Sequence, residues 1–276
     1  MPTFILVLLI VIAILLIVTV YLVSPRIFKK ADRNPFLGHF YAHRGFHDNL
    51  SDAPENSLKA FKKAVEKGYG IELDVQLTRD EQVVVFHDND LKRVCGIDAP
   101  VNSFTYDELL KLHICDSEEK IPLFTEVLDV IDGKVPLIVE IKMVDAKTRV
   151  CELANDILVK YDGKYMVESF HPFAVKWFRE HRPKLLRGQL SCNFIKEGIK
   201  ETFGMWLVHY LLTNFMCRPD FVAYSCESYN NVFFKLSKLL GALPVAWTVK
   251  SPEKLKEIKN KYKLFIFEGF EPEKYL

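Results

Sequence analysis

After one unbroken apolar run at its start, the chain alternates between short apolar runs and amphipathic stretches. The short runs are rich in β-branched and aromatic residues, which predicts strands. The stretches between them repeat apolar positions every three to four residues, as helices do. The predicted strands are 40–44, 70–76, 136–142, 165–170, 186–191, 221–225, 244–249 and 264–268. The predicted helices are 57–67, 147–160, 172–180, 230–240 and 252–261.

This alternation predicts an α/β fold with a parallel sheet, and eight such units predict a TIM-type (β/α)8 barrel. In this fold the active site lies at the carboxyl ends of the strands. The run QVVVFH at 82–87 follows strand 70–76 too closely for a parallel crossover, so we expect an antiparallel hairpin. A turn centred on Arg79 and Asp80 would then place His87 opposite Glu72.

The opening run, 4–23, reads FILVLLIVIAILLIVTVYLV and carries no charge. It is long enough for a helix to cross a hydrocarbon core of about 30 Å. A cleaved signal peptide usually has a cationic start and a shorter apolar core, whereas only Met1, Pro2 and Thr3 precede this run. We therefore expect a single-pass transmembrane anchor at 1–25, a linker at 26–37 and a barrel at 38–276. A signal peptide and a buried core helix are the alternatives.

Charge and cysteine content bear on location. Four basic residues follow the apolar run, Arg26, Lys29, Lys30 and Arg33, so the positive-inside rule places the barrel on the cytoplasmic side of a membrane. Six scattered cysteines without a C-x-x-C pair agree with a reducing compartment, although an even count also permits disulfides. With 37 basic and 36 acidic residues the chain lacks the positive excess of a nucleic-acid-binding protein.

Acidic residues occupy predicted strands. Glu72 and Asp74 are two residues apart, so both side chains point to one face, and an inward position is costly without a cation or a partner. Glu140 lies on another strand, with Lys142 on the same face. Three carboxylates suit a hard divalent cation such as Mg²⁺ or Ca²⁺. The alternative is salt-bridge pairing among Glu72, Asp74, Arg44 and Lys142.

Two histidines end predicted strands. His43 and His87 would supply a general acid and a general base near neutral pH, with a structural hydrogen-bonding role as the alternative for each. Arg44 offers a planar fork of donors for phosphate oxygens. The sequence contains neither a G-x-S-x-G elbow nor a P-loop, which disfavours serine-hydrolase and nucleoside-triphosphate chemistry. Together these groups predict phosphate-ester chemistry.

Several motifs occur in an informative order: AHRGF at 42–46, PENS at 54–57, ELDVQLTRD at 72–80 and VVVFHD at 83–88. Further on come VEIK at 139–142, SF at 169–170 and AWTV at 246–249. In this order and spacing the chain resembles the glycerophosphodiester phosphodiesterases over roughly residues 38–268. The resemblance implies a TIM barrel that acts on phosphodiesters.

The resemblance also implies individual roles. The implied acid/base pair is His43 and His87, and the implied ligands of one divalent cation are Glu72, Asp74 and Glu140. The implied substrate- and phosphate-binding residues are Arg44, Lys142, Glu55, Asn56, Phe170 and Trp247. For the two aromatic residues, which match positions beside the glycerol or the leaving group, ordinary barrel packing is the alternative.

The implied reaction releases glycerol 3-phosphate and an alcohol such as choline or ethanolamine. The nucleophile is water or the substrate's own 2-hydroxyl, the second route passing through a cyclic phosphate. The sequence departs from the family at three places: Glu81 replaces a usual glycine, Lys250 replaces a common asparagine, and the last strand ends in FIFEGF rather than T-D or T-N. Glu81 changes the hairpin turn but no side chain of the site, whereas the other two changes bear on substrate contacts and leaving-group preference.

The segment 203–217, FGMWLVHYLLTNFMC, is strongly apolar but too short to span a bilayer. It predicts either a barrel helix or an interfacial helix at a membrane surface. The first functional interpretation is a membrane-anchored phosphodiesterase acting on small soluble substrates. The alternatives are lysophospholipase D-like action on a lipid at the membrane, and a non-catalytic scaffold that binds a phosphate ligand.

Overall fold

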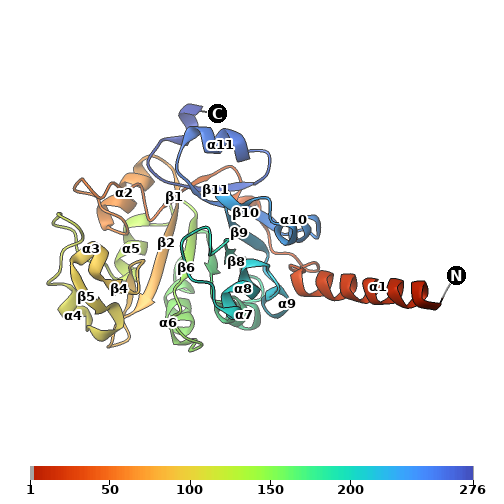
Figure 1. Cartoon of the computed structure of the whole chain (residues 1–276). Helices are drawn as coiled ribbons and strands as arrows, with labels where there is room; N and C mark the ends of the chain where they lie inside the picture. Colours follow the sequence, from red (N-terminus) through yellow and green to blue (C-terminus); the bar gives the residue numbers. More distant parts are fainter. Residues whose placement is uncertain (1–2, 276) are drawn as a thin grey trace.

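A closed barrel of eight parallel strands forms the body of the computed structural model, which describes residues 3–275 (Figure 1). The pairing of β1 with β2 closes the ring. The barrel strands are β1 (Phe40–His43), β2 (Gly70–Leu77), β6 (Leu137–Ile141), β7 (Tyr165–Ser169), β8 (Arg187–Ser191), β9 (Phe221–Ser225), β10 (Leu243–Val249) and β11 (Leu264–Phe267). The predicted TIM-type fold is confirmed.

Helices cover the outside of the barrel and pack on its outward-facing apolar side chains. They are α2 (Leu58–Glu66), α5 (Phe124–Ile131), α6 (Arg149–Leu158), α7 (Pro172–His181), α8 (Phe203–His209), α9 (Asn214–Cys217), α10 (Val232–Leu239) and α11 (Pro252–Ile258). Short 3-10 helices lie at η1 (Asn34–Phe36), η2 (Val101–Ser103), η3 (Cys226–Ser228) and η4 (Pro272–Tyr275). The sequence pattern did not predict α5.

The barrel interior changes from apolar to polar along the strands. Its lower layer is formed by large buried side chains: Tyr41, Ile138, Met166, Val245 and Ile266. Two residues further along the same strands come His43, Glu140, Glu168, Trp247 and Glu268. Because side chains alternate faces along a strand, this second set also points inward. The polar layer therefore lies at the carboxyl ends of the strands, where the predicted site was expected.

The predicted hairpin forms, but its register is not the predicted one. β3 (Val83–Val85) runs antiparallel to β2 and pairs Val85 with Val75. The loop closes through the amide of Thr78 and the carbonyl of Gln82, 3.0 Å apart, so it centres on Asp80. This moves the pairing by one residue, and His87 does not lie opposite Glu72. The side chain of His87 still reaches the central cavity, because the residue lies beyond the last ladder pair.

A small lobe inserted between β3 and α5 was also not predicted (Figure 1). It contains β4 (Asp90–Leu91), α3 (Lys92–Cys95), β5 (Ile97–Pro100) and α4 (Tyr106–Leu109). The lobe has its own apolar core, which includes Leu91, Val101 and Ile114. Its elements are too short to show a clear hydrophobic period in the sequence.

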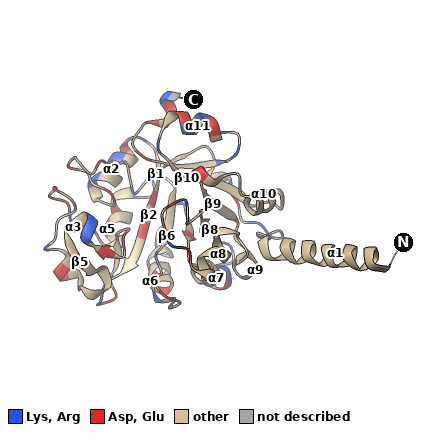
Figure 2. Cartoon of the chain, in the orientation of Figure 1, with Lys and Arg blue, Asp and Glu red and all other residues tan. Residues whose placement is uncertain are grey.

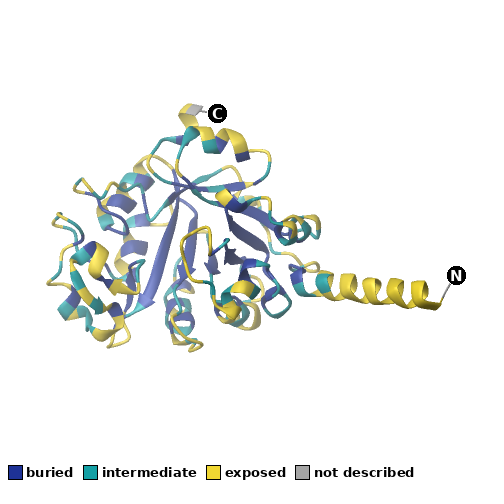
Figure 3. Cartoon of the chain, viewed as in Figure 1, coloured by how far each residue is buried: buried dark blue, intermediate teal, exposed yellow. Residues whose placement is uncertain are grey.

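The N-terminal helix α1 (Thr3–Val23) projects away from the barrel (Figure 1). It carries no charged residue (Figure 2), and its side chains are exposed along most of its length (Figure 3). Among the described residues it is the one helix long and apolar enough to cross a membrane. A membrane anchor and a signal sequence both have this length and composition.

The base of α1 is bonded to the barrel. The amide of Asn214 donates to the carbonyl of Val23 over 3.0 Å, and the guanidinium of Arg218 donates to the carbonyls of Tyr21 and Ser24, each over 2.9 Å. The stretch predicted to be a linker, 26–37, continues along the barrel. Within it, Arg33 donates to the carbonyl of Asp220 over 2.6 Å.

The apolar segment 203–217 forms the two short helices α8 and α9. Val208 and Cys217 are buried, as expected of barrel helices. Phe203 and Trp206, in contrast, are 75% and 40% exposed, and their rings stack 6.0 Å apart. The segment therefore combines a packed face with an exposed aromatic one.

Candidate active site

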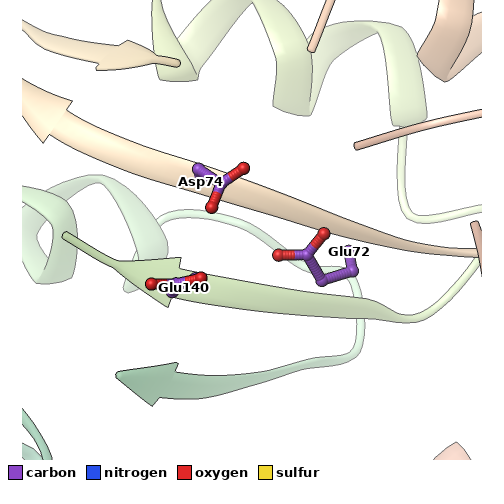
Figure 4. A group of neighbouring side chains, drawn as sticks. All are labelled: Glu72, Asp74 and Glu140. Carbon is purple, nitrogen blue, oxygen red and sulfur yellow. The ribbon is translucent and has the colours of Figure 1, made fainter. Parts of the chain in front are cut away.

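Three buried carboxylates meet at the polar end of the barrel (Figure 4). Glu72 and Asp74 come from β2 and Glu140 from the neighbouring β6, where the strand register pairs Asp74 with Glu140. One oxygen of each side chain lies within 4.8 Å of the others. Hard divalent cations take carboxylate oxygens as ligands and draw them together, so these three residues fit such an ion.

The positive charges around the three carboxylates do not balance their negative charges. Burial, and then the charges of Asp74 and Glu140, raise the pKa of Glu72 well above its ordinary value. Burial also raises the pKa of Glu140. At Asp74 burial acts in the same direction, but Lys142, His87, Arg44 and Asn56 together outweigh it and lower the pKa of that group. Like charges held together in a buried site favour proton or cation uptake.

The alternative of salt-bridge pairing is present in part. The ammonium of Lys142 lies 3.0 Å from Asp74 and 2.9 Å from Glu140, and Arg44 Nε lies 3.7 Å from Asp74. Glu72, however, has no Lys or Arg side chain within ion-pair distance among the described residues, and its nearest basic nitrogen is His43 Nε2 at 3.9 Å. Lys142 therefore pairs with two of the three acids but brings only one positive charge, and Glu72 has no lysine or arginine partner among the described residues.

Arg44 is fixed by the turn that follows β1. Its backbone is left-handed with φ 55°, and Gly45 follows with φ 82°. A Cβ atom on Gly45 would lie 2.9 Å from the carbonyl carbon of Ala60, so only glycine fits there. The turn directs the Arg44 amide to Glu72 over 3.1 Å and its guanidinium to Glu55 over 2.6 Å.

Glu55 and Asn56 support the site from behind and do not line the cavity. Despite its burial, Glu55 has its pKa lowered to about 2 by Arg93 and Arg44. The amide of Asn56 donates to Asp74 over 3.0 Å. Both residues therefore orient a neighbour that belongs to the predicted site.

Each candidate histidine is held by a carboxylate through Nδ1. His43 Nδ1 lies 2.5 Å from Glu268, and His87 Nδ1 lies 2.6 Å from Asp88. Burial lowers the pKa of His43 to about 4, although Glu268 opposes this shift. At neutral pH the His43 ring is then uncharged, with its proton on Nδ1 and a lone pair on Nε2. Both rings line the same cavity as Glu72 and Glu140.

Arg93, in the inserted lobe, connects the carboxylate that supports His87 with the carboxylate that supports Arg44. Arg93 Nε lies 2.7 Å from Asp88, and its two terminal nitrogens each lie 2.7 Å from an oxygen of Glu55. One guanidinium therefore fixes both the support of His87 and the support of Arg44. Bidentate pairing of this kind sets orientation as well as charge.

The cavity at the carboxyl ends of the strands has a volume of about 1050 Å³. Among the predicted site residues, those that line it are His43, His87, Arg44, Lys142, Glu72, Glu140, Phe170 and Trp247. Asp74 lies beneath them and is fully buried. The rings of Phe170 and Trp247 stand 5.4 Å apart and nearly perpendicular, at 86°. The structure thus brings the charged and aromatic candidates together in one hollow.

Sequence reasoning assigned no role to four residues of this site: Asp88, Arg93, Glu168 and Glu268. Three of them offered a signal, because Asp88 directly follows His87, Glu268 ends the last predicted strand, and Glu168 directly precedes the SF motif. Polar residues at the carboxyl ends of barrel strands are candidates for the site. Arg93 offered no comparable signal, since its lobe was not predicted.

Comparisons with known proteins agree with this geometry. The model of the glycerophosphoryl diester phosphodiesterase family matches residues 43–264. The putative glycerophosphodiester phosphodiesterase YhdW of Bacillus subtilis is 34% identical over 219 residues, which cover 76% of this chain and 85% of that protein. Human lysophospholipase D GDPD1 is 32% identical over 167 residues, which cover 57% of this chain and 47% of that protein.

Solved structures share the fold. A phosphodiesterase of Oleispira antarctica, in complex with the product sn-glycerol-3-phosphate, superposes with a TM-score of 0.69 at 23% identity, covering 87% of this chain and 96% of that one. A glycerophosphodiester phosphodiesterase of Thermotoga maritima gives 0.64 at 25% identity, covering 83% and 94%. With its matched family model, the chain belongs to the glycerophosphoryl diester phosphodiesterase family and is a phosphoric diester hydrolase.

Proposed function

We propose that this enzyme hydrolyses glycerophosphodiesters to glycerol 3-phosphate and an alcohol, with a divalent cation and an acid/base pair of histidines. One observation carries the proposal: three buried carboxylates and two carboxylate-supported histidines face the same cavity. The fold neighbour from Oleispira antarctica, described with sn-glycerol-3-phosphate as its product, supports the substrate class.

In this proposal Glu72, Asp74 and Glu140 hold Mg²⁺ or Ca²⁺, which when bound neutralises charge on the phosphate oxygens. Arg44 and Lys142 hold the phosphate from the side. Arg44 is oriented in advance by Glu55, so little entropy is lost when its guanidinium meets an anion. Lys142 stays charged, because Asp74 and Glu140 outweigh burial and raise its pKa.

The proton transfers fall to His43 and His87. One ring removes a proton from the attacking oxygen, which belongs to water or to the substrate's 2-hydroxyl. The other ring gives a proton to the departing alcohol as the phosphorus–oxygen bond breaks. Each ring is held at Nδ1, which leaves Nε2 to act. Phe170 and Trp247 flank the organic parts of the substrate.

The full-length protein in detergent should release glycerol 3-phosphate from glycerophosphocholine in the presence of Mg²⁺ or Ca²⁺. Excess EDTA should abolish the release, and readdition of the cation should restore it. Undiminished turnover in EDTA, after the loss of bound metal has been verified by elemental analysis, would refute the metal-dependent part of the proposal.

We further propose that α1 is a retained single-pass anchor at 1–25 that holds the barrel, 38–276, on the cytoplasmic side through the stretch 26–37. The carbonyls of Tyr21 and Val23 accept hydrogen bonds from Arg218 and Asn214, and cleavage after α1 would remove these acceptors. An intact N-terminus by mass spectrometry and resistance to carbonate extraction would support the anchor. A mature chain starting after α1 would contradict it.

Lysophospholipase D-like action on a lipid is the second candidate. The cavity is lined by apolar side chains beyond the charged floor, among them Met143, Phe194, Met205 and Leu207, which could accept an acyl chain. Phe203 and Trp206 are exposed on the same helix as Met205 and Leu207. Human lysophospholipase D GDPD1 is among the relatives of this chain.

The double substitution Phe203→Ser and Trp206→Ser should lower kcat/KM for vesicle-bound lysophosphatidylcholine by about 10-fold, because two exposed apolar side chains would no longer enter the lipid. Turnover of glycerophosphocholine should stay unchanged, since neither side chain lines the cavity. Val159→Ser, a substitution of an exposed apolar residue just after α6, is the matched control. Equal loss on both substrates would argue against an interfacial role.

A further inference from the structure

One carboxylate of the cavity has no assigned partner. Glu168, on β7, is 1% exposed, and its Oε2 atom is buried without a hydrogen bond. Among the described residues it makes no ion pair, because the ammonium of nearby Lys142 is committed to Asp74 and Glu140. A buried carboxylate without a partner is costly, so a ligand with positive charge would stabilise it.

Aromatic rings lie beside this carboxylate. Phe170 follows Glu168 by two residues on the same strand, so both side chains point into the barrel. Its ring meets Trp247 at 86° and lies 6.0 Å from the ring of Phe194. The indole nitrogen of Trp247 donates to the carbonyl of Ala223 over 3.1 Å, so its N–H is already used. All four side chains line the cavity.

We propose that Glu168, Phe170 and Trp247 form a subsite for a cationic alcohol, the choline or ethanolamine part of the substrate. This inference rests on the proposed phosphodiesterase function and names the substrate class of the same site. Aromatic faces attract ammonium groups, and a quaternary ammonium is the cation that such rings recognise best. A carboxylate at the base of the rings adds a charge interaction that is little screened inside the protein.

The position of the subsite suits a phosphodiester. The register places Glu168 beside Glu140 on the adjacent strand, about 4.8 Å away as strands are spaced. A phosphate at the three acids thus lies one strand from Glu168. In choline and ethanolamine esters, two carbons separate the ester oxygen from the nitrogen. The ammonium can then reach the carboxylate while the ester oxygen stays beside the histidines.

A second metal ion fits these surroundings less well. Glu168 is not one of the three residues, Glu72, Asp74 and Glu140, whose carboxylate oxygens lie within 4.8 Å of one another. The aromatic side chains that share the cavity with Glu168, those of Phe170, Phe194 and Trp247, have no oxygen atoms, whereas Mg²⁺ and Ca²⁺ need six or more oxygen ligands. An organic cation does not need them.

The test compares cationic with neutral leaving groups. In the full-length protein, Glu168→Gln should lower kcat/KM about 10- to 100-fold for glycerophosphocholine and glycerophosphoethanolamine, and less than about 2-fold for glycerophosphoglycerol. Trp247→Leu should reduce the preference for the cationic substrates in the same direction. Glu180→Gln, an exposed acid on the helix after β7, is the matched control. Binding of choline alone, measured by calorimetry, should weaken in Glu168→Gln by a similar factor.

Other outcomes overturn the inference. Equal loss on all substrates together with weaker metal binding would assign Glu168 to the metal site. No change in any of these measurements would show that Glu168 has no part in recognition. If the unmodified protein turns over neutral and cationic diesters without preference, the ammonium subsite fails while the phosphodiesterase function stands. If it turns over neither, the function itself fails, and choline binding alone decides the fate of the subsite.

Discussion

Replacing His43 or His87 with alanine is expected to lower kcat by about 10²- to 10⁴-fold, the usual contribution of a positioned acid or base. Neither ring belongs to the three-carboxylate group, so the affinity for the divalent cation should change little. The measurements are initial rates of glycerol 3-phosphate release and metal binding by calorimetry. His113→Ala, an exposed histidine of the inserted lobe, should leave both values unchanged.

Substituting the carboxylates that hold the two histidines tests the same assignment with a smaller expected effect. Glu268→Gln and Asp88→Asn keep a side chain of similar size at His43 and His87 but remove the negative charge. Each should cost less than the loss of the ring, about 10-fold or more, and should shift the pH profile of kcat. Full activity of either histidine variant would refute the assignment of the acid/base pair.

Adding Mg²⁺ or Ca²⁺ to metal-free protein is expected to raise the Tm of the barrel by about 5–10 °C, since a cation at 100 times its Kd contributes about 2.7 kcal/mol. Glu72→Gln should abolish both this rise and the activity, because one of the three ligands is lost. Thermal unfolding followed by circular dichroism, with and without EDTA, is the measurement. An unchanged metal-induced rise in Glu72→Gln would remove Glu72 from the metal site.

In EDTA, the effect of Glu72→Gln on the Tm depends on the pKa of Glu72. The pKa of Glu72 is raised well above 4.5 by burial and by its acidic neighbours. The unfolded chain then loses this proton at a lower pH than the folded protein, so the contribution of Glu72 to stability falls as pH rises through its folded pKa. At mildly alkaline pH without metal, Glu72→Gln should therefore unfold at the same Tm as the unmodified protein or higher. A clearly lower Tm would contradict this account of the charges.

The sequence predicted the barrel because each strand is a short apolar run bounded by polar residues, and such runs keep their character in any tertiary context. The sequence also predicted that Glu72 and Asp74 point to the same face, because residues two apart on a strand always do so. The grouping of these acids with Glu140 needs one thing more, the pairing of strand β2 with strand β6, which the parallel barrel supplies.

Features that depend on individual hydrogen bonds or on contacts between distant segments could not be predicted in this way. The hairpin register was off by one residue because the closure of its loop, through Thr78 and Gln82, depends on a local hydrogen bond that apolar patterning does not encode. Glu268 appeared only as a departure from the family, and its contact with His43 spans 225 positions. The isolation of Glu168 is likewise visible only once its neighbours are placed.

The matching supports of the two histidines have a consequence for reactions of more than one step. Each ring is hydrogen-bonded to a carboxylate through Nδ1, which leaves Nε2 free to act in the shared cavity. In the proposed mechanism, one ring ends the first displacement with an extra proton and the other ends it lacking one. The protonation states of the two rings are then the reverse of the starting ones. A second displacement at the same phosphorus can run with the acid and base roles exchanged, and it restores the starting protonation states without a proton from bulk water.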